Sequence, residues 1–153
     1  MLDNKETNDI ELKEQMELFH TRCRQTNLRI TPQRTTIYKA LIESKDHPSA
    51  EMLRQKIRTN FPNISLDTIN RTLLTLRDIG AAYILEGSGD PKRFEGNLNT
   101  HQHFKCVECR RIIDFHHKPF DNIKVPAVLS KQFTVLRKTV YFEGICNKCR
   151  DKK

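Results

Sequence analysis

The sequence predicts an α+β protein in which an N-terminal winged helix-turn-helix domain precedes a small second domain with a structural zinc site. Helical spacing dominates the first half of the chain and is followed by short β-rich segments. Two C-x-x-C pairs occupy the second half, and the 153 residues carry a formal net charge of +8. We expect the first domain over residues 1–96, disorder over 1–10, a hinge over 97–100 and the second domain over 101–153.

The first two predicted helices are indicated by apolar spacing and by a capping signal. In the first, a 4-3-4 spacing places four residues on one stripe, namely Leu12, Met16, Phe19 and Cys23. Because free cysteine is commonly buried, we interpret Cys23 as a core residue and not as a reactive thiol. The second helix follows Thr31, a suitable N-cap, and Pro32 fits its first position.

Two more helices form the predicted helix-turn-helix. The segment HPSAEMLRQKIRTNFP has apolar residues in helical phase and ends at Pro62, which cannot continue a helix. Ser65 is the expected N-cap of the next helix, and Gly80 suits its C-terminal cap. The expected inner stripe of this last helix is Leu66, Ile69, Leu73 and Leu76.

Short strands follow the helices. The segments AAYILE and KRFEG flank the turn-rich GSGDP at residues 87–91, which predicts a β-hairpin and completes a winged helix-turn-helix. In the second domain we expect strands in HFKC and RIIDF. We also expect a long strand in FTVLRKTVYF, residues 133–142, because it is rich in β-forming residues.

The helix that follows Ser65 is the predicted DNA-recognition helix, because the second helix of such a motif enters the major groove. Its polar residues include arginine and asparagine, which can pair with guanine and adenine edges. The candidate DNA-binding residues are Ser65, Thr68, Asn70, Arg71 and Arg34. A solvated helix face is the alternative interpretation, but the basic charge and the order of helices favour double-stranded DNA as partner.

Four of the five cysteines form a predicted structural zinc site. Cys106 and Cys109 make one C-x-x-C pair, and Cys146 and Cys149 make the other. Two such pairs complete a tetrahedron of thiolates with no open position, which is typical of zinc that stabilises a fold. Redox-active dithiols and a rubredoxin-like iron site are the alternatives.

Histidines and carboxylates near the first cysteine pair suggest a second metal site. His101 and His103 alternate by two, so on a strand they point to the same side. Asp114 follows the cysteine pair, whereas Glu95 and His47 precede it in the chain. From chemistry alone, surface histidines explain the pattern equally well.

The chain resembles the ferric uptake regulator superfamily from about Arg22 to Cys149. The resemblance is carried by RITPQR, HPSAE, SLDTINRTL, KRFEG, HQHFKCVECRRIIDF and GICNKC, in this order. It implies a dimeric, metal-sensing transcription factor that binds a palindromic DNA operator. It further implies that residues 101–153 form an α/β dimerisation and metal-binding domain.

The same resemblance implies a regulatory Fe²⁺ or Mn²⁺ site. Its ligands would be His47, Glu95, His101, His103 and Asp114. The aspartate at position 114 resembles the pattern of the peroxide-sensing (PerR-type) repressors of the family. In those repressors, Fe²⁺-catalysed oxidation of a ligating histidine releases DNA, and the corresponding residues here are His47 and His101. Glu95 is more similar to the iron-uptake regulators, so an iron- or manganese-responsive uptake regulator is the alternative.

The sequence also departs from the family pattern at three positions. Asn70 replaces a tyrosine common before the recognition arginine, so we expect a different DNA site. Gln102 and Lys138 occupy positions that contribute to an additional metal site in some members, and we do not expect that site here.

Other classes of protein fit less well. A zinc hydrolase or deaminase is disfavoured because the chain lacks H-x-E and P-C-x-x-C motifs, so we expect no enzyme. A zinc-ribbon adaptor that binds only protein leaves the winged helix and the basic charge unexplained. The sequence contains neither a long apolar span nor a signal peptide, and we expect a cytoplasmic protein without membrane contact.

Overall fold

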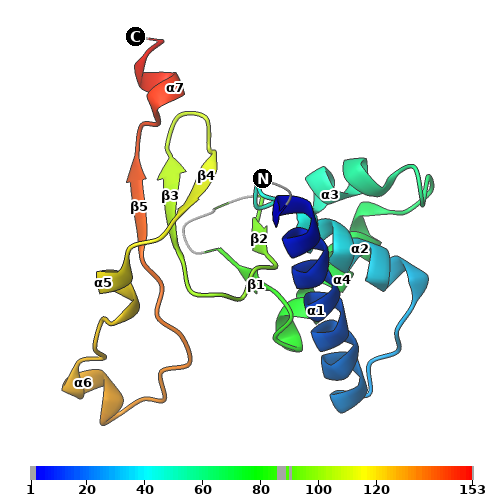
Figure 1. Ribbon diagram of the computed structural model, residues 1–153, viewed down its shortest axis with the longest axis horizontal. Coiled ribbons are helices and arrows are strands. Elements are labelled where there is room, and N and C mark those ends of the chain that lie inside the picture. The colour runs from blue at the N-terminus through cyan, green and yellow to red at the C-terminus, as the bar shows by residue number, and fades with distance from the viewer. Residues whose placement is uncertain (1–2, 86–88, 90, 153) are drawn as a thin grey trace. The chain divides into compact units, whose positions relative to one another are not determined.

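The computed structural model describes residues 3–85, 89 and 91–152, and it divides into two compact units, Met1–Leu98 and Asn99–Lys153. The boundary between the units falls within residues 97–100, where the sequence predicts a hinge. The first unit contains α1 (Asp3–Gln25), α2 (Pro32–Glu43), α3 (Ala50–Ile57), α4 (Leu66–Asp78), β1 (Tyr83–Ile84) and β2 (Phe94–Glu95) (Figure 1).

Capping hydrogen bonds start three of these helices at the residues that the sequence predicts or allows. The hydroxyl of Thr31 accepts from the Arg34 amide at 3.2 Å, and that of Ser65 accepts from the Thr68 amide at 3.1 Å. Ser49 caps α3 in the same way. Gly80 follows α4 with φ +72°, a left-handed conformation that a side chain would strain, and this confirms its predicted capping position.

The first unit has a continuous apolar core that joins its helices to β2. Cys23 lies fully buried in this core, which confirms that it is a core residue. The predicted inner position of Leu66 is wrong, because this side chain is 40% exposed. Thr72 is buried in its place, and its hydroxyl donates to the Thr68 carbonyl at 2.9 Å, which satisfies the polar group.

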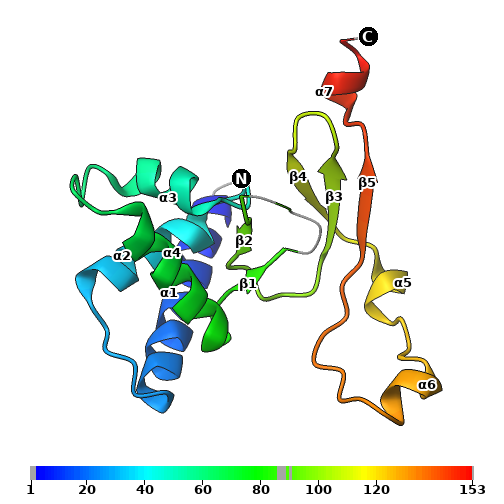
Figure 2. The ribbon, with the colours of Figure 1, turned by 180° about the vertical axis from the view of Figure 1, so that it is seen from behind.

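Helix α1 and the hairpin differ in part from the expectation. The sequence predicts disorder over residues 1–10, whereas α1 begins at Asp3; residues 1 and 2 lie outside the described part of the chain. Strands β1 and β2 pair antiparallel, with Tyr83 opposite Glu95, so the hairpin is confirmed (Figure 2). The predicted turn over 87–91 lies partly outside the described residues, at 87, 88 and 90.

The second unit is built on a three-stranded sheet. Its elements are β3 (Gln102–Cys106), β4 (Ile112–Phe115), α5 (Lys118–Asp121), α6 (Ala127–Ser130), β5 (Tyr141–Gly144) and α7 (Asn147–Arg150). The strand order is β4-β3-β5, with β3 antiparallel to β4 and parallel to β5. Figure 1 shows α7 continuing directly from the end of β5.

The long strand predicted over residues 133–142 is wrong. Only Tyr141–Gly144 forms β5, since its pairing with β3 starts at the register His103–Tyr141. Leu136, in the part that forms no strand, is 91% exposed. The length of β5 is therefore limited by the short strand β3 with which it pairs, although the residues before Tyr141 favour extended structure.

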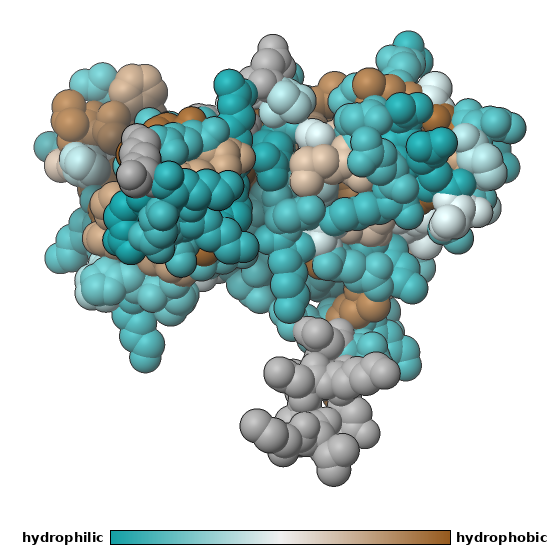
Figure 3. All heavy atoms as spheres, turned by 90° about the horizontal axis from the view of Figure 1, so that it is seen from above, coloured by the Kyte–Doolittle hydropathy of each residue, from teal (hydrophilic) through white to brown (hydrophobic). Residues whose placement is uncertain are grey.

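The second unit buries little apolar surface among its described residues. Cys106, Ile112 and Cys146 are its buried hydrophobic residues, while several larger ones are exposed. Figure 3 shows one face of the molecule, which is mostly hydrophilic with separate hydrophobic patches. No described helix is both long and apolar enough to cross a membrane.

Candidate metal centres and nucleic-acid interface

The four cysteines of the C-x-x-C pairs meet at one end of the sheet. Cys106 ends β3, and its register partner on β5 is Gly144, two residues before Cys146. Because the two strands run parallel and side by side, the turns that follow them bring both pairs together. The four sulfur atoms lie within 4.8 Å of one another, and the Cys146 amide donates to the Cys106 sulfur at 3.4 Å.

The electrostatics of this cluster fit a divalent cation. Backbone amides, that of Cys146 first, lower the pKa of the Cys106 thiol to about 6. Burial, with hydrogen bonding to the neighbouring cysteines, raises the pKa of Cys149 to about 12. Four sulfurs this close cannot all ionise unless a cation compensates their charge. Zinc coordinated by all four would supply that charge, and this donor set has no open position for chemistry.

A second donor set of the same unit lies on β3, on β4 and on His101, which directly precedes β3. Asp114 is the register partner of His103, and its Oδ1 lies 3.4 Å from His103 Nε2 and 3.6 Å from His101 Nε2. His101 Nδ1 donates to the Asn99 carbonyl at 2.7 Å. This bond assigns the proton to Nδ1 and leaves the Nε2 lone pair available to a metal. The cluster thus offers two imidazoles and one carboxylate, and no thiol.

The first unit contains a third group, a buried pair of one histidine and one carboxylate. His47 Nε2 lies 2.8 Å from Glu95 Oε2, and both side chains are almost completely buried. The other oxygen of Glu95 accepts from the Asn97 amide at 2.6 Å. A buried carboxylate is tolerated only when it is paired and hydrogen-bonded, as it is here.

Arg93 holds the loop that carries His47. Its guanidinium donates to the carbonyls of Asp46 and His47, and the Phe94 amide donates to the Pro48 carbonyl at 3.0 Å. His47 itself has φ +49°, an uncommon conformation for a residue with a side chain. The hairpin strand β2 therefore fixes the histidine in a backbone geometry that it would rarely adopt alone.

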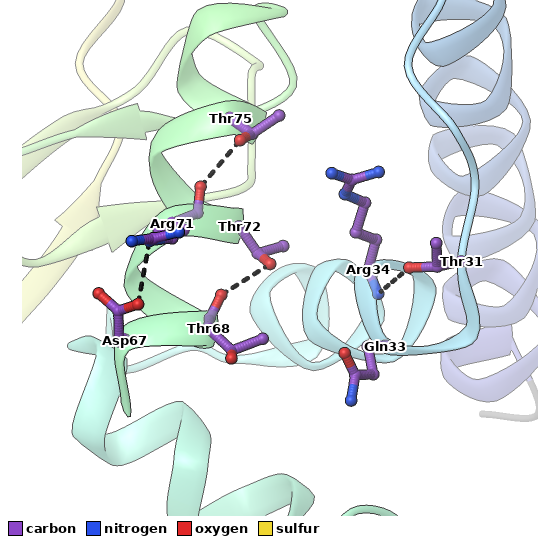
Figure 4. Close-up of a pocket in the computed structure, with 8 residues that line it drawn as sticks. All are labelled: Thr31, Gln33, Arg34, Asp67, Thr68, Arg71, Thr72 and Thr75. Carbon is purple, nitrogen blue, oxygen red and sulfur yellow. Dashed lines mark hydrogen bonds and ion pairs between the residues drawn. The ribbon is translucent and has the colours of Figure 1, made fainter. Parts of the chain in front are cut away.

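The helix-turn-helix contains an open groove of about 360 Å³ between the N-terminal turn of α2 and the face of α4 (Figure 4). The residues that line it are Thr31, Gln33, Arg34, Asp67, Thr68, Arg71, Thr72 and Thr75. Arg71 Nε forms an ion pair with Asp67 Oδ2 at 2.9 Å. Hydroxyl groups and guanidinium groups from two helices thus share one accessible surface.

The structure brings together most of the predicted DNA-binding residues. Arg34, Thr68 and Arg71 line the groove, whereas Ser65 caps α4 and Asn70 is exposed on α4 outside the groove lining. The sequence reasoning missed Thr31 and Gln33 as lining residues, although their position in the first turn of α2 could have indicated them. Of the predicted metal ligands, the four cysteines meet in one cluster, His101 and His103 lie close to Asp114 within the second unit, and His47 lies close to Glu95 within the first unit.

The two residues that depart from the family pattern in the second unit are engaged in hydrogen bonds. The side-chain amide of Gln102 donates to Asp121 Oδ1 at 2.8 Å and its oxygen accepts from the His117 amide. Lys138 Nζ donates to the Ile123 carbonyl at 2.6 Å. These side chains therefore connect β3 and the segment before β5 to the region of α5.

Relatives of known name match almost the whole chain. The chain is 36% identical over 141 residues to a protein of Staphylococcus saprophyticus named peroxide-responsive repressor PerR, covering 92% of this chain and 95% of the relative. A Staphylococcus aureus protein of the same name is 36% identical over 129 residues, covering 84% of this chain and 87% of the relative.

Solved structures agree with the fold. The ferric uptake regulator Fur of Helicobacter pylori has a TM-score of 0.73 at 24% identity, covering 91% of this chain and 93% of its own. PerR from Streptococcus pyogenes has a TM-score of 0.50 at 31% identity, covering 88% of this chain and 92% of its own.

The family model of the ferric uptake regulator family matches residues 25–143, which include α2 to α4, β1 to β4 and most of β5. The match spans both units, and so it includes the groove and all the histidine and carboxylate donors described above. The chain belongs to the ferric uptake regulator family.

Proposed function

We propose that this protein is a metal-dependent transcriptional repressor that senses peroxide through a regulatory Fe²⁺ ion. The observation that carries the proposal is that the sulfur donors form one set and the imidazole and carboxylate donors form others. Sulfur donors gather in one closed cluster, and the remaining donors are imidazole and carboxylate groups without a thiol. The 36% identity to proteins named peroxide-responsive repressor supports the same function.

The sulfur cluster would hold a structural Zn²⁺. Cys106, Cys109, Cys146 and Cys149 provide the four soft ligands of such a site. Its function would be to hold the ends of β3 and β5 together, since few other residues in the described part of the second unit are buried.

The imidazole and carboxylate groups would together hold one regulatory Fe²⁺ or Mn²⁺. The proposed ligands are His47, Glu95, His101, His103 and Asp114. Borderline-to-hard donors of this kind suit both ions, and two carboxylates offset a divalent charge. Neither His47 with Glu95 nor the group on β3 and β4 supplies five ligands alone, so the proposal joins donors of both units. An ion held in this way would restrict the relative motion of the two units and so select a DNA-binding state.

Peroxide would act through this regulatory site and not through a thiol. Bound Fe²⁺ supplies peroxide-cleaving chemistry, whereas bound Mn²⁺ keeps the ligands intact. One oxygen atom of peroxide would enter an imidazole ring of His101 or His47, and the other would leave as water. An oxidised ring is a poorer ligand, and loss of the metal would release DNA. Cys23 is an unsuitable alternative sensor because it is fully buried, and burial raises the pKa of its thiol.

Mass spectrometry of peroxide-treated protein tests this function. Protein loaded with Fe²⁺ is expected to gain one oxygen on His101 or His47 after dilute peroxide, whereas protein loaded with Mn²⁺ is expected to stay unmodified. A Cys23→Ala variant should behave like the parent protein. Oxidation confined to cysteines would refute the proposal. Unmodified histidines, with metal-dependent DNA binding retained, would favour an iron- or manganese-responsive uptake regulator.

The DNA partner would be a double-stranded palindromic operator. Helix α4 would enter the major groove as the second helix of the helix-turn-helix, and the groove between α2 and α4 supplies Arg34 and Arg71. The net charge of +8 supports attraction to a polyanion. A palindromic site would match a protein with twofold symmetry.

The proposed homodimer would form through the second unit. Strand β5 lies at one edge of the sheet, and exposed edge strands favour pairing with another chain. Large apolar side chains of the second unit are exposed, including Val128, Phe133, Leu136, Phe142 and Ile145. A Leu136→Glu variant is expected to be monomeric by light scattering, whereas Ile10→Glu, at an exposed apolar position of the first unit, should remain dimeric.

A further inference from the structure

Asp67 brings a negative charge to a surface that is otherwise suited to DNA. It is the one acidic residue among the eight that line the groove between α2 and α4. Its side chain is 72% exposed and lies in the first turn of α4, and Figure 4 shows it beside Arg71. A carboxylate at this position would repel the phosphates of any DNA that α4 approaches.

The pair that Asp67 forms differs from another acid–arginine pair of the same unit. In α3, Glu51 is also an acid of the first turn, and it accepts two hydrogen bonds from Arg54, through Nε at 2.9 Å and Nη2 at 2.8 Å. That pair lies outside the residues that line the groove. In α4, the closest approach of Asp67 is to Nε of Arg71, at 2.9 Å.

This geometry matters for base recognition. A guanidinium reads guanine by donating two hydrogen bonds to O6 and N7, and its two terminal amino groups can supply both. A carboxylate placed at Nε restrains the orientation of the guanidinium without needing those amino groups. Restraint before binding reduces the side-chain entropy that is lost when the complex forms.

We propose that Asp67 is a specificity-determining residue that positions Arg71 for one guanine of each half-site and disfavours DNA that lacks it. The proposal rests on the proposed DNA-binding function of α4. On the matching sequence, Arg71 contacts the base and its pairing with Asp67 is retained. On other sequences Arg71 gains no base contact, and the carboxylate still repels nearby phosphates, so affinity falls.

The test compares base preference and not affinity alone. Protein loaded with zinc and Mn²⁺ first selects its preferred duplexes from a randomised pool. Affinities are then measured for the best duplex, for duplexes with each other base at every selected guanine, and for an unrelated duplex. The variants are Asp67→Ala, which removes the carboxylate, and Asp67→Asn, which removes its charge and keeps its shape. Glu51→Ala is the matched control, since it removes an acid–arginine pair of α3 that lies outside the groove lining.

The proposal predicts a change at one guanine. For Asp67→Ala, the preference for this guanine over the other bases should fall by about threefold to tenfold, which is near the lower end of the roughly fivefold to 150-fold expected for loss of a whole bidentate contact. Affinity of both Asp67 variants for the unrelated duplex should stay equal or increase, because a repulsive charge is removed. Glu51→Ala should match the parent in every ratio.

Two results would overturn the proposal while DNA binding stands. The first is an unchanged base preference in Asp67→Ala. The second is an equal loss of affinity on all duplexes with a lower melting temperature, which would assign Asp67 to helix stability only. If the parent protein selects no common sequence, the DNA-binding function itself is refuted, and the role of Asp67 with it.

Discussion

Replacing Cys106 with serine is expected to unfold the second unit and leave the first unit folded. Cys106 is completely buried at the end of β3, and its sulfur accepts a hydrogen bond from the Cys146 amide. Serine keeps the size of the side chain approximately but is a poor zinc ligand. The perturbation therefore removes the proposed metal and only a small part of the packing.

The expected loss of stability is large because few apolar contacts stabilise the second unit. Apart from Cys106 and Cys146, the buried hydrophobic residue of its described part is Ile112. Full burial of one such side chain stabilises a fold by about 1.5–3 kcal/mol. Structural zinc contributes an apparent free energy of about 10–16 kcal/mol near pH 7. Because the metal contribution is several times larger, the free energy lost when one ligand is removed should exceed the stabilisation that the apolar contacts provide.

The first unit is expected to be unaffected because it has its own core. Among the residues that the structure describes, fifteen buried ones form one cluster there, and none of these comes from the second unit. Hydrogen exchange should show lost protection in β3, β4 and β5 and retained protection in α2 and α4. Elemental analysis should show loss of zinc, and light scattering should show loss of the dimer.

A Cys23→Ala variant is the matched control, since Cys23 is equally buried but lies in the first unit. It should keep its zinc and its protected sheet. Full zinc content in Cys106→Ser, or unchanged exchange in β3, would refute the reasoning.

Three further predictions concern the first unit. Arg71→Ala should weaken binding to a selected operator by about 1–3 kcal/mol in a titration, as for loss of a base contact, and equal affinity would remove Arg71 from the recognition surface. Arg93→Ala should weaken binding of the regulatory metal by about tenfold to a hundredfold in competition with a chelator, because the loop of His47 loses two hydrogen bonds; unchanged affinity would contradict this role. Burial raises the pKa of Tyr38 from 10.0 to about 12, so the unfolded chain ionises first and unfolding free energy should fall as pH rises through this range. Tyr38→Phe should lack this decline in denaturant titrations, and a parallel decline in both proteins would exclude Tyr38 as its source.

Local chemistry made the helices and the cysteine cluster predictable. Thr31 and Ser65 cap helices because their hydroxyls satisfy amides three residues onward, an interaction that depends only on neighbours in sequence. The two C-x-x-C pairs were equally recognisable, because their spacing suits one ion.

Features that depend on distant partners were not predictable from local patterns. Strand β5 is short because it pairs in parallel with β3, which lies far away in the sequence. The exposure of Leu66 likewise reflects packing around α4, where a hydrogen-bonded Thr72 is buried. The close pairing of His47 with Glu95 depends on a loop that Arg93 and β2 hold in place.

The most direct test of peroxide-sensing repression is operator binding by protein loaded with Fe²⁺ or with Mn²⁺, each measured before and after dilute peroxide. Both forms should bind the operator before treatment. Peroxide is expected to abolish binding of the Fe²⁺ form and to leave binding of the Mn²⁺ form unchanged. Retained binding in the Fe²⁺ form, or equal loss in both forms, would contradict it.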